Sequence, residues 1–312
     1  MASDHSRFAG QTDPGASVSH IRKWPVRRLT TAWKLLEYSS AYLAVLGALE
    51  VVMVQLLLSL PPSTAPVVVG LVTFGIYAND RLVDLGSDEV SNPGRTAFAR
   101  QYQSVLYVVA AVAYGTAVAL AVRGGPFALG LTLVPGLAWV LYAIDWIPAV
   151  APTVHRLKEL VVINSMIVAV AWSATIVFLP IAFADGALSP TAWVIFAYLT
   201  LGTFVCAEIS NVRDVDSDRA SGVSTLPVAL GVRRTRHVLY GISLLDGVLV
   251  AIATLTGYLT ALSAGALLLG LASLLGIVSL LGRTSLEQTL SVAAEFTRIP
   301  VLGTLLVASG LL

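Results

Sequence analysis

The sequence is poor in charged residues and nearly devoid of cysteine. Only 12% of its 312 residues are Asp, Glu, Lys or Arg, whereas a soluble domain carries about 25%. At the same time 56% of the residues are hydrophobic, and the mean hydropathy is +0.82. This composition excludes an intrinsically disordered chain and leaves too little charge to coat a water-soluble globule. The single cysteine, Cys206, excludes an intrachain disulfide, and a net charge of +1 gives no reason to expect nucleic acid as a partner.

Long apolar runs indicate a membrane protein. A bilayer core about 30 Å thick requires about 20 mostly apolar residues in each spanning helix. We therefore predict an all-α, polytopic membrane bundle of about nine transmembrane helices, at residues 35–60, 65–78, 104–122, 127–146, 160–183, 191–207, 238–259, 261–281 and 299–312. The second run reaches full length only if its helix continues into residues 79–88. We expect the polar, basic residues 1–34 to form a tail ahead of one transmembrane domain, residues 35–312.

The connections between these runs alternate in charge. Those after odd-numbered runs are short or uncharged, and those after even-numbered runs are long and charged. Eighteen of the nineteen Lys and Arg side chains lie in the tail and in the even-numbered connections, which include Arg298, and Arg123 lies on the other side. Because Lys and Arg mark the cytoplasmic side, the sequence predicts a multi-pass protein of the cell membrane. Its N terminus would be cytoplasmic and its C terminus outside.

Two acidic clusters follow the second and sixth expected spans. The members of each cluster are spaced three or four residues apart and so share one helix face: Asp80, Asp84 and Asp88 in the first, and Asn211, Asp214 and Asp218 in the second. Hard oxygen ligands at this spacing suit Mg²⁺, which takes one or two carboxylates together with substrate phosphates. Solvated carboxylates paired with neighbouring arginines are the simpler explanation for either cluster alone. Two such clusters favour metal ions that bridge a diphosphate.

The clusters resemble the two aspartate-rich motifs of UbiA-type intramembrane prenyltransferases. The first family motif, Asn-Asp-x-x-Asp-x-x-x-Asp, matches residues 80–88, and the second, Asp-x-x-Asp-x-x-x-Asp, matches residues 211–218. Residues 218–228 resemble the segment that follows the second motif in many members. Arg81 and Asn211 stand where the family has acidic residues, which lowers the negative charge and leaves the number of metal ions open.

The resemblance implies an Mg²⁺-dependent enzyme that moves a polyprenyl group from its diphosphate to a lipophilic acceptor, either a quinone-precursor aromatic or another lipid. Asp84 and Asp214, the central members of their clusters, would be catalytic. The metal ligands would be Asp80, Asp84, Asp88, Asn211, Asp214 and Asp218. The residues that bind the diphosphate would be Arg81, Arg95, Tyr142, Lys158, Asn164, Arg213 and Arg219.

Two other functions remain open at this point. A related membrane terpene cyclase would ionise the same substrate and trap the carbocation within it, without an acceptor. A transporter would place carboxylates near the middle of its spans, whereas most carboxylates here lie at span ends. Glu50 and Asp246 do fall inside expected spans, where they could line an acceptor pocket or make structural hydrogen bonds.

The charge distribution predicts that both acidic clusters face the cytoplasm. Single cysteines introduced in residues 88–92 and 221–224 should react with a membrane-impermeant thiol reagent only from the inside. A cysteine in place of Arg123 should react only from the outside. Labelling of the two cluster loops from outside would overturn this topology.

Overall fold

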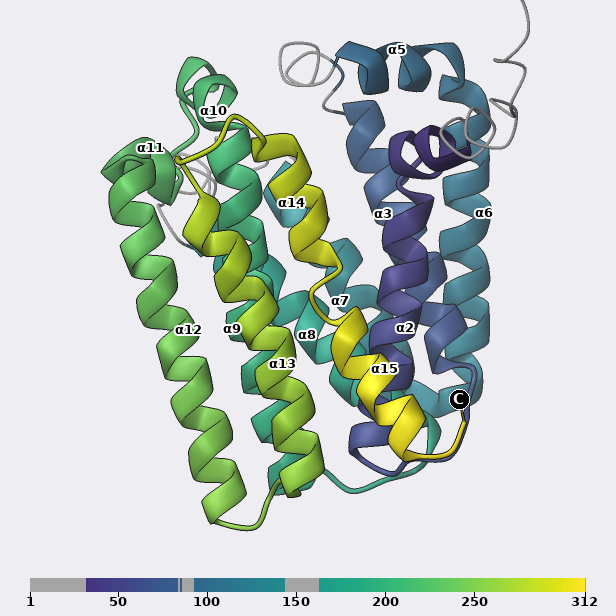
Figure 1. Cartoon of the computed structure of the whole chain (residues 1–312). Helices are drawn as coiled ribbons and strands as arrows, with labels where there is room; N and C mark the ends of the chain where they lie inside the picture. The colour runs from purple at the N-terminus through teal and green to yellow at the C-terminus, as the bar shows by residue number, and fades with distance from the viewer. Residues whose placement is uncertain (1–31, 84, 86–92, 144–162, 312) are drawn as a thin grey trace, which may run out of the picture.

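The computed structural model of the chain describes residues 32–83, 85, 93–143 and 163–311 (Figure 1). All regular structure in these residues is helical, which confirms the predicted all-α class. The longer helices are α2 (Ala41–Leu57), α3 (Ala65–Val83), α6 (Gln103–Ala121), α7 (Gly125–Ala143), α8 (Ile163–Phe183), α9 (Pro190–Arg213), α12 (Val232–Leu255) and α13 (Ala261–Leu280). The shorter ones are α5 (Pro93–Gln101), the 3-10 helix η1 (Val122–Gly124), α10 (Val215–Ser221), α11 (Leu226–Leu230), α14 (Glu287–Glu295) and α15 (Ile299–Ala308).

The predicted count of nine spans is not confirmed. In the described part of the chain, seven helical stretches are long and apolar enough to cross a membrane, or eight if the pair Ala32–Tyr38 and α2, bent by 79°, is one span. The stretch Gln103–Val140 counts once, although η1 and a positive φ of 82° at Gly125 divide it into α6 and α7. The last predicted span corresponds to α15, which reaches spanning length only together with α14.

The long helices pack side by side as one bundle. Helices close in sequence are mostly neighbours, since α2 packs on α3, α3 on α6, α7 on α8 and α8 on α9. Distant segments also meet, because α15 packs on α2 and α14 packs on α9. Figure 1 shows α2, α3 and α6 on one side of the bundle, with α9, α12 and α13 on the other.

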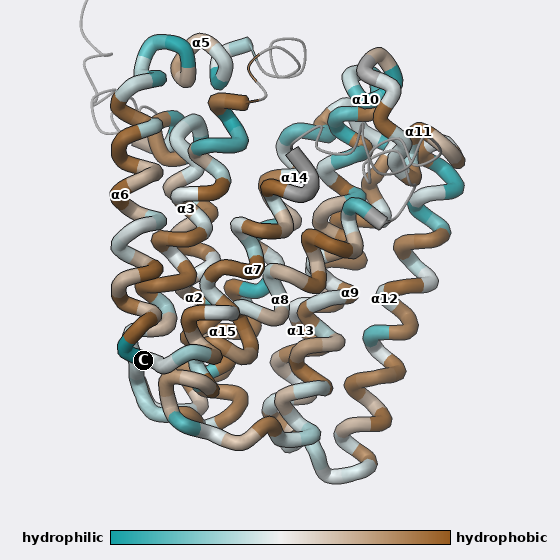
Figure 2. Tube along the Cα trace, turned by 180° about the vertical axis from the view of Figure 1, so that it is seen from behind, coloured by the Kyte–Doolittle hydropathy of each residue, from teal (hydrophilic) through white to brown (hydrophobic). Residues whose placement is uncertain are grey.

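Polar and apolar residues separate along the bundle. Figure 2 shows hydrophilic residues gathered at the end that carries α5, α10 and α11. Apolar side chains instead face outward from the helices, as with Val112 on α6 and Leu244 and Leu255 on α12, the last of them 88% exposed. Such an outer surface is unfavourable in water and normal in lipid. The chain is an integral membrane protein, and the side on which each end lies stays a prediction.

Both acidic clusters begin where a long helix ends at the polar end of the bundle. Helix α3 continues beyond Ala78 to Val83, as the second span needed to reach full length. Helix α9 runs on to Arg213. At the opposite end of α9, the Ser189 side chain caps the helix by accepting a hydrogen bond from the backbone N–H of Ala192 at 3.2 Å. The two helices thus bring residues more than one hundred positions apart to the same end of the molecule.

Candidate active site

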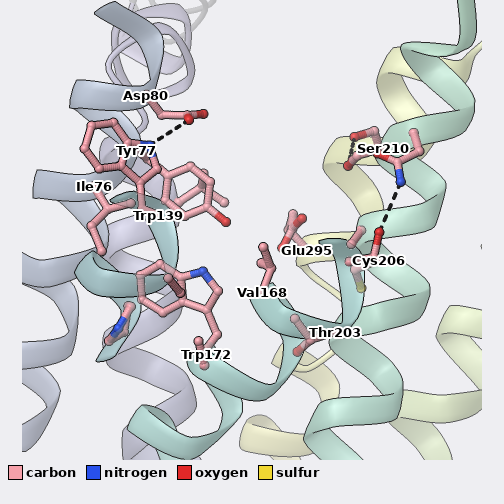
Figure 3. A pocket seen from close by; sticks show the side chains of 18 of the residues that line it. Ile76, Tyr77, Asp80, Trp139, Val168, Trp172, Thr203, Cys206, Ser210 and Glu295 are labelled. Carbon is pink, nitrogen blue, oxygen red and sulfur yellow. Dashed lines mark hydrogen bonds between the residues drawn. The ribbon is translucent and has the colours of Figure 1, made fainter. Parts of the chain in front are cut away.

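A cavity of about 280 Å³ lies inside the bundle near its polar end. Its walls are formed by α2, α3, α7, α8, α9 and α14 (Figure 3). Asp80 and Arg81 of the first cluster line it, as do Asn211 and Arg213 of the second. Residues from both segments therefore face a common cavity.

The first cluster is held by side chains from other segments. The indole Nε1 of Trp139 on α7 donates a hydrogen bond to Asp80 Oδ1 at 3.0 Å (Figure 3). The Nε of Arg81 donates to Ser40 Oγ at 3.0 Å, which ties the end of α3 to the segment before α2. The other two members of the predicted stripe, Asp84 and Asp88, lie outside the described residues. The metal and catalytic roles predicted for them stay predictions.

Asn211 of the second cluster belongs to a chain of buried polar groups. Its side-chain amide donates to Ser165 Oγ at 3.2 Å, and the Ser165 hydroxyl donates to Glu208 Oε1 at 2.6 Å. Asn164, the neighbour of Ser165 on α8, lines the same cavity. The bond to Ser165 fixes the orientation of the Asn211 amide, because Ser165 lies on a neighbouring helix and is itself held by Glu208.

Asp214 and Asp218 do not line the cavity, although Arg213, the residue before Asp214, does. Helix α9 stops before Asp214 and α10 starts after it, so the predicted face is not one uninterrupted helix. The Asp214 carboxylate pairs with Arg213, whose Nε donates to Oδ1 at 2.8 Å and whose Nη1 donates to Ser291 Oγ at 3.1 Å. Asp218 accepts a hydrogen bond from Thr225 Oγ1 at 3.3 Å. Burial, and next the neighbouring Asp214 carboxylate, raise the pKa of Asp218 to about 6.

The structure separates the predicted diphosphate-binding residues into three groups. Arg81, Asn164 and Arg213 line the cavity. Arg219 does not: its side chain is 62% exposed and pairs with Asp216 at 3.2 Å, because α10 turns it toward solvent. Arg95 is buried on α5 and is likewise not part of the lining. The side chains of the remaining two, Lys158 and Tyr142, lie outside the described part of the structure.

One wall of the cavity is aromatic. The rings of Tyr77 and Trp172 stack with centroids 5.8 Å apart and planes inclined by 11°. Tyr42 and Trp139 also line the cavity, and Figure 3 shows Tyr77, Trp139 and Trp172 on the same side. The π faces of such rings attract positive charge and exclude water.

An ion pair that the sequence did not predict lies beside the cavity. Arg298 was assigned to a polar connection, but it lies between α14 and α15 inside the bundle. Its Nη1 donates to Glu50 Oε1 at 2.6 Å, and its Nη2 donates to Thr203 Oγ1 at 2.7 Å and to the Leu199 carbonyl at 3.3 Å. Glu50 thus makes an ion pair next to the cavity, while Asp246 on α12 lines a separate small hollow.

Glu295, the last residue of α14, was also missed. It lines the cavity together with Arg298, and Figure 3 shows it between the aromatic wall and the α9 side chains. The available signal was the apolar spacing of Leu290, Ala293 and Ala294, which extends the last apolar run backward past both charged residues.

The oxygen donors at this end of the cavity fit Mg²⁺. Among the described residues, no group of three or more His, Cys, Asp or Glu side chains is placed to hold a metal alone. Mg²⁺ does not require such a group, since it binds one or two carboxylates and completes its shell with phosphate oxygens and water. Asp80 and Asn211 supply oxygens of this kind from α3 and α9, and the carboxylates of Asp214 and Asp218 follow shortly after the end of α9.

Comparison with known proteins places these features in a family. Residues 60–297 match the model of the UbiA prenyltransferase family. The chain is 34% identical over 109 residues to digeranylgeranylglyceryl phosphate synthase of Natronomonas pharaonis, covering 35% of this chain and 38% of that protein. It is 28% identical over 187 residues to the synthase of the same name from Methanoculleus marisnigri, covering 56% and 59%. The matches thus span between about two fifths and three fifths of the length of these relatives.

Solved structures show the same fold at low sequence identity. A UbiA homologue from Aeropyrum pernix K1 superposes with a TM-score of 0.65 at 16% identity, covering 85% of this chain and 97% of that one. A UbiA homologue from Archaeoglobus fulgidus, bound to DMAPP and Mg²⁺, gives a TM-score of 0.59 at 12% identity, covering 88% and 99%. The family match over most of the sequence agrees with this fold and with the two acidic clusters. The chain belongs to the UbiA prenyltransferase family.

Proposed function

We propose that this protein is an Mg²⁺-dependent prenyltransferase that moves a polyprenyl group from its diphosphate to a lipophilic acceptor within the membrane. The observation that carries the proposal is one cavity with two kinds of lining. Acidic, amide and arginine side chains of both family motifs meet at its polar end, and aromatic and apolar side chains line its interior.

Side chains from both motifs would bind the diphosphate. Arg81 and Arg213 reach the cavity from α3 and α9, and each is held by a hydrogen bond that it donates to a serine in another part of the chain. Guanidinium groups fixed in this way can bind phosphate oxygens without reorganising as charge develops. Mg²⁺, held by the motif oxygens described above and by Asp84 and Asp88, would neutralise charge on the departing pyrophosphate.

The aromatic and apolar interior of the cavity suits the electron-poor allylic carbon that forms when pyrophosphate leaves. Loss of pyrophosphate makes this carbon electron-poor, and water would capture it if water could enter. The stacked Tyr77 and Trp172 rings present π density to positive charge and occupy space that water would fill. The polyprenyl chain itself would lie among the apolar side chains of the bundle.

The acceptor is proposed to be a lipid that bears a hydroxyl group. The named relatives form digeranylgeranylglyceryl phosphate, which carries prenyl groups on a glyceryl phosphate. Their names support a lipid alcohol more than a quinone precursor. The site is further proposed to lie at the cytoplasmic side of the cell membrane.

The purified full-length chain in lipid nanodiscs tests this function. With a series of prenyl diphosphates and lipid alcohols, we expect pyrophosphate release and a prenylated lipid, both abolished by EDTA and restored by Mg²⁺. A hydrocarbon product formed without acceptor would instead indicate a terpene cyclase. Absence of any Mg²⁺-dependent product, together with ion flux in liposomes, would contradict the proposal and favour a transporter.

The two central aspartates should be essential, and a neighbouring one should not. We expect Asp84→Ala and Asp214→Ala each to lower turnover by at least about 10²–10³, since each removes electrostatic stabilisation of the leaving group. Asp216→Ala is the matched control, because this side chain is 91% exposed and its partner is Arg219. Pyrophosphate release and thermal melting should be measured for all three variants. Equal damage from Asp216→Ala and Asp214→Ala would refute the assignment.

Trp139 should act through Asp80. Trp139→Phe keeps an aromatic ring in the wall and removes the hydrogen bond to the Asp80 carboxylate. We expect kcat/KM for the prenyl diphosphate to fall about tenfold, the value of one hydrogen bond to a charged group. Trp193→Phe, at a half-exposed position outside the cavity, should leave kcat/KM unchanged. Similar losses in both variants would show that the Asp80 bond is unimportant.

A further inference from the structure

We propose that Glu295 is the base that takes the proton from the hydroxyl group of the lipid acceptor. This inference rests on the proposed function and deepens it, because it assigns the acceptor's position and names the residue that completes the reaction.

Glu295 lies where the main cavity meets two smaller hollows. The main cavity of about 280 Å³, a second hollow of about 60 Å³ and a third of about 10 Å³ all have Glu295 and Arg298 in their walls. The second hollow continues among Leu43, Leu46 and Ile176, which are apolar. A lipid alcohol placed here would have its hydroxyl beside Glu295 and its chain in the apolar extension.

The Glu295 carboxylate has no partner within the described part of the protein, where neither a hydrogen bond nor an ion pair reaches it. The other acidic side chains near the cavity differ in this respect. Glu50 is paired with Arg298, Glu208 accepts from Ser165, and Asp80 accepts from Trp139. A carboxylate inside a membrane bundle is costly unless something donates to it. The hydroxyl of a bound acceptor would supply that donor.

A helix break places this carboxylate in the cavity. Helix α14 ends at Glu295 and α15 begins at Ile299, so residues 296–298 form a turn inside the membrane-spanning stretch. Non-helical backbone at such depth is tolerated in membrane proteins where it lines a cavity or is buried in protein. The break is therefore a second observation, independent of the unpaired carboxylate, that points to a ligand at this position.

Arg298 lies near Glu295 but forms no ion pair with it. Its guanidinium is already engaged by Glu50, Thr203 and the Leu199 carbonyl, which belong to α2 and α9. These bonds hold the turn between α14 and α15 against two other helices. Glu295 stays available to the acceptor because its cationic neighbour is occupied.

The chemical step balances with this residue as proton acceptor. The bond between C1 of the prenyl group and the diphosphate oxygen breaks, and its electron pair leaves with pyrophosphate. A lone pair of the acceptor oxygen forms the new carbon–oxygen bond at C1, and the hydroxyl proton passes to Glu295. Tyr77 and Trp172 line the opposite wall, so the carbon that reacts would lie between the aromatic rings and the carboxylate.

The test compares two glutamates of the same helix. Glu295→Gln keeps the size of the side chain and removes the base, whereas Glu287→Gln changes the first residue of α14, which lines none of these hollows. In Glu295→Gln, transfer to a lipid alcohol should fall by about 10²–10⁴, the range for loss of a general base. A prenyl thiodiphosphate binds like the donor, but its bond between C1 and sulfur does not break readily. Its Mg²⁺-dependent binding should be unchanged in Glu295→Gln. Glu287→Gln should leave both quantities unchanged.

A second variant and a second acceptor sharpen the test. Glu295→Asp keeps a carboxylate one methylene farther away and should retain more activity than Glu295→Gln. A fluorinated lipid alcohol, whose hydroxyl is more acidic, should recover part of the loss in Glu295→Gln, because a weaker base then suffices.

The proposal is overturned if Glu295→Gln transfers at the normal rate, or if Glu295→Asp is as inactive as Glu295→Gln. It is also overturned if thiodiphosphate binding falls together with transfer, because Glu295 would then serve the donor. Failure of the proposed function looks different: the unaltered protein would neither bind the thiodiphosphate with Mg²⁺ nor transfer to any acceptor.

Discussion

The buried ion pair between Arg298 and Glu50 is the interaction on which the interior of the site depends. The side chains of Arg298 and Glu50 are only 13% and 12% exposed, so each charge requires the other and the polar groups around it. The pair joins the turn between α14 and α15 to α2, and the bonds from Arg298 to Thr203 and the Leu199 carbonyl extend the connection to α9. Removing one partner would leave an uncompensated charge in the bundle, so the broken helix, the cavity and the ion pair form one structural unit.

The same need to satisfy buried polar groups orients the residues at the polar end. Trp139 holds Asp80, Ser165 links Asn211 to Glu208, and Ser291 holds Arg213. In each case the partner comes from a different helix, so the packing of the bundle sets the direction of the functional group. A site of this kind is organised before substrate binds, which is the condition under which fixed charges stabilise a transition state most effectively.

Sequence periodicity predicted the helices and the polar end better than it predicted the interior. The spacing of Asp80, Asn211 and their neighbours could be assigned to helix ends because α3 and α9 are long and mostly apolar before those residues. Arg298 and Glu295 were missed because a count of charges assigns any cation between apolar runs to a loop. The apolar spacing before it points to a longer helical run, and the tertiary contact with Glu50 shows that this cation is buried. The count of nine spans is not confirmed, because Gln103–Val140 counts as one spanning stretch where the sequence predicts two runs.

The position of the acidic clusters also explains why cations are needed there. Both clusters begin at the carboxyl ends of helices, α3 and α9, where the helix dipole presents partial negative charge. Most phosphate sites use the opposite end of a helix, where backbone N–H groups attract an anion.

Here a diphosphate would face two negative dipole ends and several carboxylates, and these charges would repel it unless positive charge lay between them. Arg81 and Arg213 occupy the last turns of these two helices, where cations are stabilised. They offset part of this repulsion, and bound Mg²⁺ would offset the rest, so that diphosphate and metal would bind together and neither would bind well alone.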